Sequence, residues 1–209
     1  MSPSIPSIKR LFVGIGGGVP SAKRNVRLGE AVTSMPESEQ TGGFLWPLPA
    51  LLRNAAQDMR SEHPGRGNRI KAYMETMFNK WLRMASYRQP PDPDLFFCTD
   101  QPHLDDGPAL TAAIPLRPSL DRRTVIKNAA LRDGIARRHD VLCFEMEAAG
   151  PMTEYPSMVI RLISDYADSH KNGRWQRYAP ATAAACAKEL LSYVDPEVAA
   201  DEPTPTPRT

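Results

Sequence analysis

Apolar positions along the chain fall into short continuous runs and longer periodic stretches. Three runs, at 11–13, 141–144 and 158–163, are almost entirely apolar, and a weaker run covers 30–34. Short runs with few polar positions predict strands that are buried on both faces of a sheet.

Between these runs, apolar side chains recur at the spacing of a helix. The expected helices cover 49–60, 68–87, 124–139, 148–152 and 179–194. The second of them carries an apolar face with helical periodicity, made of Ile70, Met74, Met77, Phe78, Trp81 and Met84. Buried strands separated by helices predict an α/β fold.

Composition excludes several classes of protein. Lys and Arg total 26 and Asp and Glu total 24 in 209 residues, and this balance argues against an electrostatic nucleic-acid binder. The apolar runs are far shorter than the roughly 20 residues of a membrane helix, and residues 1–10 lack a signal-peptide run. We therefore expect an intracellular, cytoplasmic protein without a membrane partner. Three widely spaced cysteines predict neither a disulfide framework nor a Cys-x-x-Cys metal site.

Proline marks the irregular parts of the chain. The sequence holds 21 prolines, seven of them between Pro90 and Pro118, which cannot sustain a helix or a central strand. We expect an N-terminal extension at 1–10, one domain at 11–195 with a proline-rich excursion at 88–120, and a disordered tail at 196–209.

Polar segments follow three of the expected strands. These segments are 14–20, 145–150 and 164–168. In α/β sheets ligands bind beyond the carboxyl ends of strands, so parallel strands would bring all three segments to one edge. Asp168, His170 and the arginines between 122 and 138 are expected on the solvent-exposed surface.

The glycine-rich segment fits no dinucleotide fingerprint and no P-loop, since Val19 stands where a third glycine is required and no glycine stands directly before Lys23. Two interpretations stay open. The glycines form a tight turn after the strand, or the backbone at Gly14 and Gly16 forms a cradle for a small ligand.

Acidic residues dominate the other two segments. Glu145 and Glu147 would point to one side and Met146 to the other, which suits a sugar with paired hydroxyls; the alternative is an acidic first turn of a helix. Ser164 and Asp165 are either a helix N-cap or a shielded general acid. The sequence contains no His-Glu-x-x-His or Gly-x-Ser-x-Gly motif, so it predicts no metal site and no serine triad.

Together these segments resemble the purine-nucleoside/uridine phosphorylase superfamily, which includes the nucleosidases. The resemblance is carried by Val-Gly-Ile-Gly-Gly-Gly at 13–18, Arg-Leu-Gly-Glu-Ala-Val-Thr at 27–33, Phe-Glu-Met-Glu-Ala-Ala-Gly at 144–150 and Ser-Asp-Tyr-Ala-Asp at 164–168. The segments are most similar to domains that fungi place at the N-terminus of larger sensor or ankyrin-bearing proteins. The resemblance implies a mixed sheet flanked by helices and a purine nucleoside as ligand.

The resemblance also implies site residues. Asp165 would protonate the departing purine, a general-acid effect of about 10²–10⁴. Glu147 would bind the ribose hydroxyls, Met146 would pack on the sugar with Glu145 beside them, and Ser164 would position Asp165. Gly14 and Gly16 would approach the phosphate or water. No cofactor is implied other than phosphate as a co-substrate.

Several departures from the family pattern weaken the case for phosphorolysis. Phe12 and Ile15 stand where family phosphorylases have an arginine and a hydroxyl residue that bind phosphate. The family's first strand, and a strand lining the base pocket before 125–128, are expected to be missing. Two hypotheses follow: a hydrolytic or phosphorolytic enzyme, or a catalytically impaired nucleoside-binding or interaction module. A homo-oligomer or a larger parent protein could complete the site.

Overall fold

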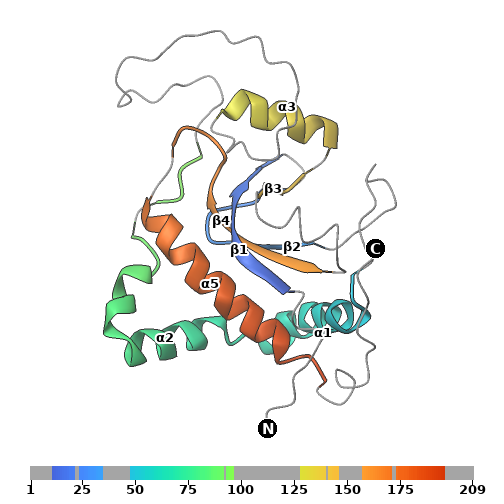
Figure 1. Ribbon diagram of the computed structural model, residues 1–209, viewed down its shortest axis with the longest axis vertical. Helices are drawn as coiled ribbons and strands as arrows, with labels where there is room; N and C mark the ends of the chain where they lie inside the picture. The colour runs from blue at the N-terminus through green and yellow to red at the C-terminus, as the bar shows by residue number, and fades with distance from the viewer. Residues whose placement is uncertain are drawn as a thin grey trace, which may run out of the picture.

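The computed structural model describes residues 11–21, 24–34, 48–91, 93–96, 128–139, 141–145, 157–170 and 173–195, and structural statements concern these ranges. They form a mixed four-stranded sheet, in the order β2-β4-β1-β3, flanked by helices. Figure 1 shows α5 running along the sheet, with α1 and α2 toward one end and α3 at the other. The expected α/β fold is confirmed.

The two long strands lie in the middle of the sheet. β1 (Leu11–Gly18) and β4 (Met158–Asp165) are parallel and pair from Leu11↔Met158 onward. β2 (Ala31–Thr33) is antiparallel to β4. The hydrogen bonding between the two segments continues before β2, where the N–H of Gly29 donates to the Ile163 carbonyl at 2.9 Å.

The strand at 141–144 is shorter than expected and runs the other way. β3 (Cys143–Phe144) pairs antiparallel with the carboxyl end of β1, so the expectation of parallel strands sharing one edge is wrong for this segment. The chain enters the sheet beside Val19, whose N–H donates to the Leu142 carbonyl at 2.9 Å, and then runs back along β1.

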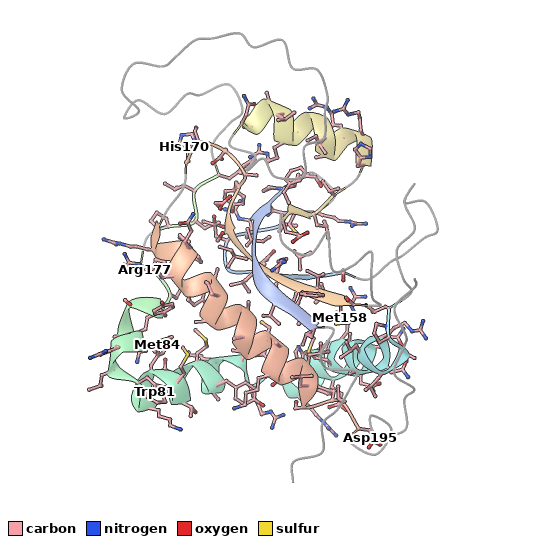
Figure 2. The ribbon with its side chains drawn as sticks, in the orientation of Figure 1. Trp81, Met84, Met158, His170, Arg177 and Asp195 are labelled. Carbon is pink, nitrogen blue, oxygen red and sulfur yellow. The ribbon has the colours of Figure 1, made fainter. Side chains whose placement is uncertain are left out.

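The main core lies between β4 and two helices. Met158, Ile160 and Leu162 alternate along β4 and contact α1 (Ala50–Arg66) and α5 (Gly173–Leu191). Side chains two apart share one face of a strand, so the apolar run supplies a complete buried face. Burying each such side chain stabilises the fold by about 1.5–3 kcal/mol. Figure 2 shows Met158 beside α1 and His170 beyond the far end of β4.

A second apolar cluster joins α2 to α5. Met74 and Phe78 of α2 (Ile70–Lys80) pack on Ala181 and Ala185, whose small side chains allow the helices to approach closely. The expected helix at 68–87 is interrupted because Trp81 is extended, and the chain continues as the 3-10 helix η2 (Leu82–Tyr87).

A buried carboxylate ties the junction of α1 and α2 to α5. Glu189 is 2% exposed, accepts a hydrogen bond from the Arg69 N–H at 3.3 Å and lies 3.4 Å from Nε2 of His63. The Arg69 guanidinium lies 3.6 Å from its other oxygen. These partners stabilise the negative charge of Glu189, whose burial would otherwise be costly.

The remaining expectations on secondary structure have mixed outcomes. The helices expected at 49–60 and 179–194 are confirmed as α1 and α5, with α5 beginning at Gly173. The helix expected at 124–139 is confirmed from Ala129 to His139 as α3, while positions 124–127 lie outside the described residues. The expected helix at 148–152, the N-terminal extension and the tail lie outside the described residues, and the proline-rich excursion is described only at its start. No helix within the described ranges is long and apolar enough to cross a membrane.

Candidate functional site

Asp165 lies at the carboxyl end of β4 and is held by its own turn. Its Oδ1 accepts a hydrogen bond from the Ala167 N–H at 2.9 Å, and the Ser164 hydroxyl donates to Oδ2 at 3.2 Å. Asp165 is 8% exposed and Ser164 1%. Asp165 belongs to a strand and α5 begins only at Gly173, so the interpretation of Ser164 and Asp165 as the cap of that helix is wrong.

The turn that holds Asp165 contains a strained residue. Ala167 has φ = 53°, a left-handed conformation that costs an L-residue about 1–2 kcal/mol. Within the described ranges it is the one residue other than glycine with positive φ. Such conformations persist where surrounding contacts over-determine them. The position of the Asp165 carboxylate is therefore imposed by the neighbouring structure.

The glycine-rich segment is part of the sheet. Gly14 and Gly16 pair with Arg161 and Ile163 inside β1, so the tight turn expected there is wrong, and a ligand-binding role of these glycines stays a prediction. The reason is packing, because a Cβ on Gly16 would lie 3.0 Å from the Phe144 carbonyl oxygen.

A register irregularity sets the side on which Asp165 leaves the sheet. Pairing changes from Gly16↔Ile163 to Gly17↔Asp165, which leaves Ser164 as an extra residue on β4. A Cβ on Gly17 would meet Oδ1 of Asp165 at 3.1 Å, whereas one on Gly16 would meet Cβ of Arg161 at 3.5 Å. Since successive residues of β1 point to opposite faces, the bulge directs Asp165 and Arg161 toward different faces of that strand.

Glu145 is bound by a buried arginine that the sequence analysis missed. Nη2 of Arg161 donates to Oε2 of Glu145 at 2.8 Å, and the Arg161 side chain is 3% exposed. Burial and the nearby Glu145 raise the pKa of the Cys143 thiol to about 11. Arg161 was detectable as the single charge within the apolar run 158–163. Oε2 of Glu145 is thus occupied by a protein partner.

Two of the expected sugar-binding residues, Met146 and Glu147, lie outside the described residues. Their roles remain predictions. The structure places Glu145 directly after β3 and Asp165 at the end of β4, and gives each of the two carboxylates its own partners.

A second buried arginine supports the Asp165 turn. Arg132 of α3 is fully buried, and its Nη1 donates to the Tyr166 carbonyl at 2.8 Å and lies 3.7 Å from Oδ2 of Asp168. Asp168 is 2% exposed, and its Oδ1 accepts the His170 N–H at 2.8 Å. The expectation that Asp168 and Arg132 lie on the surface is wrong, because each neutralises the other inside the fold.

The start of the proline-rich excursion contacts the same turn. The Tyr166 hydroxyl donates to Oδ1 of Asp94 at 2.6 Å, and Nε of Arg27 donates to Oδ2 at 2.7 Å. Phe96 meets the Tyr166 ring edge-on, with centroids 5.0 Å apart. Burial and the hydrogen bond to Asp94 raise the pKa of Tyr166, so its hydroxyl stays protonated and donating at neutral pH.

The arrangement around Asp165 suits proton transfer. Among the described residues, no group of three or more His, Cys, Asp or Glu side chains is placed to hold a metal ion. Asp165 is instead a carboxyl group shielded from water at a strand end, with its orientation fixed by backbone and hydroxyl donors. Such a group can exchange a proton with a ligand positioned against it.

Comparisons with known proteins give few relatives. No protein-family model matches the chain. A nucleotide-binding leucine-rich repeat (NLR)-like protein of Hyaloscypha variabilis is 34% identical over an alignment of 222 positions that covers 90% of this chain. The chain spans 22% of the length of that protein.

One solved structure is similar in shape. It is a putative 5'-methylthioadenosine/S-adenosylhomocysteine nucleosidase from Francisella philomiragia, with a TM-score of 0.44 and 16% sequence identity, over 89% of this chain and 68% of the other. Neither similarity assigns an activity to this chain, so its function is inferred from the residues of the site.

Proposed function

We propose that this chain cleaves the N-glycosidic bond of purine nucleosides, with Asp165 as the general acid that protonates the departing base. The observation that carries the proposal is the Asp165 carboxyl group, 8% exposed at the end of β4 and oriented by Ser164 and Ala167. Protonation lowers the cost of expelling an anionic purine as the C1′–N bond breaks. Glu147 and Met146 are proposed to bind the ribose.

Water is the favoured nucleophile. Phe12 and Ile15 carry no group that binds phosphate. Both belong to β1, in register with Val159 and Leu162. In this reaction the C1′–N bond breaks as Asp165 gives its proton to the departing base, and a bond forms from C1′ to a water oxygen. The water's second proton passes to solvent, from which Asp165 is protonated again.

A non-catalytic nucleoside-binding or interaction module is the second candidate. Oε2 of Glu145 is held by Arg161 at 2.8 Å, which removes one acceptor from the sugar site. The relative from Hyaloscypha variabilis, of which this chain spans 22%, is named as an NLR-like protein. That name fits a domain that senses or binds a ligand rather than one that catalyses a reaction. This candidate predicts nucleoside binding without base release.

The decisive assay is release of free base from adenosine, inosine and guanosine, with and without phosphate. Asp165→Asn keeps the carbonyl that accepts the Ala167 N–H but cannot donate the proton, so turnover should fall by at least ~100-fold. Glu189→Gln, at another buried carboxylate, on α5, is the matched control and should keep its turnover per folded molecule. Nucleoside binding by wild-type protein that releases no base would support the module instead.

A further inference from the structure

Arg132 combines complete burial with a position that the proposed chemistry does not use. It is 0% exposed on α3, whose last turn carries its other basic residues at the surface. Burying a guanidinium is costly unless it is closely paired. The partners of Arg132 should therefore show what the residue does.

These partners lie on the segment that follows Asp165. Nη1 donates to the Tyr166 carbonyl at 2.8 Å and lies 3.7 Å from Asp168, while Nε donates to Asp133 at 2.7 Å. The guanidinium carbon also lies 5.0 Å from the centroid of the Phe96 ring. One side chain thus contacts the turn through a backbone carbonyl and a carboxylate.

The Tyr166 carbonyl and the Ala167 N–H belong to the same planar peptide group. Arg132 binds one end of this group at 2.8 Å, and the other end donates to Oδ1 of Asp165 at 2.9 Å. The orientation of a single peptide plane therefore couples the arginine to the carboxylate.

This peptide plane has a reason to rotate. Ala167 has φ = 53°, which an alanine adopts only under constraint. Rotating the 166–167 peptide by about half a turn would return Ala167 to negative φ, where L-residues are unstrained. The same rotation would turn the N–H away from Asp165 and the carbonyl away from Arg132.

We infer that Arg132 is a positioning residue for Asp165: it fixes the 166–167 peptide plane, whose N–H orients the carboxylate. The chemical role of Asp165 rests on the proposed function, whereas the coupling through the peptide rests on the hydrogen bonds alone. α3 is thereby part of the site, although none of its side chains needs to touch the ligand.

The test is residue-resolved amide hydrogen exchange combined with base release. Arg132→Met keeps the length and apolar contact of the stem but removes the donors. Exchange at the Ala167 amide should rise at least ~10-fold, with β4 amides such as Ile160 unchanged, since only the turn loses its constraint. The turnover number should fall about 10- to 100-fold with KM changed by less than about threefold.

Two further variants keep the inference falsifiable if Arg132→Met folds poorly. Arg132→Lys retains the buried charge with a shorter reach to the Tyr166 carbonyl and should give intermediate values. Ala167→Gly removes the penalty on positive φ and, combined with either substitution, should restore most of the lost turnover and protection. A contribution of Arg132 to general stability would not be rescued in this way.

The outcomes separate this inference from the proposed function. Unchanged protection of Ala167 in folded Arg132→Met or Arg132→Lys overturns the positioning role, even if Asp165→Asn abolishes turnover. The positioning role is also overturned if amide exchange in the Arg132 variants accelerates equally at Ala167 and Ile160, as it does in Glu189→Gln. Selective loss of protection at Ala167 in a protein that releases no base supports the coupling and refutes the enzymatic function.

Discussion

Gly17 of β1 packs closely against the turn that holds Asp165. A Cβ at this position would lie 2.9 Å from Cβ of Ala167, 3.1 Å from Oδ1 of Asp165 and 3.2 Å from the Ala167 nitrogen. Two of these neighbours belong to one alanine whose backbone is already constrained, so they cannot move aside as a flexible side chain would. Gly17→Ala should therefore displace the carboxylate.

The size of the effect follows from two opposing terms. Replacing a glycine within a strand by alanine favours folding by roughly 0.5–1 kcal/mol. Overpacking of this kind costs about 1–3 kcal/mol. The net loss should be about 1–2 kcal/mol, which lowers the melting temperature by roughly 2–8 °C for a domain of this size. A shift of several tenths of an ångström at Asp165 should lower turnover by about tenfold.

Gly134→Ala in α3 is the matched control, because an added Cβ there meets no atom within 4 Å. It should raise stability by about 0.5–1 kcal/mol and leave turnover unchanged. Thermal melts and base release on both variants test the reasoning. If Gly17→Ala melts no lower than wild type and keeps full turnover, the close packing between β1 and the Asp165 turn is not a constraint.

Three further predictions concern two buried ionisable groups away from the site, Cys186 and Glu189. Burial and the nearby Glu189 raise the pKa of Cys186 to about 11, so alkylation of this thiol at pH 8 should be about 100-fold slower than in urea. Because the folded-state pKa is raised, about 2–3 kcal/mol of stability is present below pH 9 and is lost as pH rises toward 11, and a constant melting temperature over that window would contradict this. Glu189→Ala should destabilise by about 3–5 kcal/mol in urea titrations, whereas Glu75→Ala, at an exposed pair, should change stability by less than about 1 kcal/mol; equal effects would refute the distinction.

The sequence predicted the elements whose burial follows a simple pattern. β4 contains a nearly continuous apolar run, α5 carries apolar side chains at a spacing of three to four, and both were expected close to where they lie. The end of α2 was not foreseen, because Trp81 continues the apolar pattern of the helix while its backbone is extended. Periodicity reports which face is buried and not where the backbone changes conformation.

The candidate site was predictable in part. Asp165 and Ser164 were expected at the end of a buried strand, and they lie there. The glycine run was misjudged, since glycine in a turn and glycine in a crowded strand look the same in a sequence. The direction of β3 depends on where the chain enters the sheet, which local composition does not encode.

Arg132 was missed for a different reason. The basic residues around it predict a solvated helix face, and its partners Tyr166 and Asp168 lie more than thirty positions along the chain. A buried charge pair of this kind is visible only once α3 and the segment after β4 come together.

The strain and the buried charge around Asp165 bear on the choice between an enzyme and a binding module. A glycine in place of Ala167, and apolar side chains in place of the whole Arg132–Asp168 pair, would remove two unfavourable contributions to folding, and none of these positions contributes to the main apolar core. Both contributions lie at or next to the turn that orients the Asp165 carboxylate. Strained backbone that is fixed by a buried network is typical of sites where the position of a group matters within tenths of an ångström. Binding of a nucleoside alone would tolerate a looser carboxylate, whereas proton donation to a departing base would not. The Ala167→Gly variant tests this directly: unchanged nucleoside affinity with altered turnover would indicate that the turn serves catalysis, and a loss of affinity without any turnover would indicate that it serves binding.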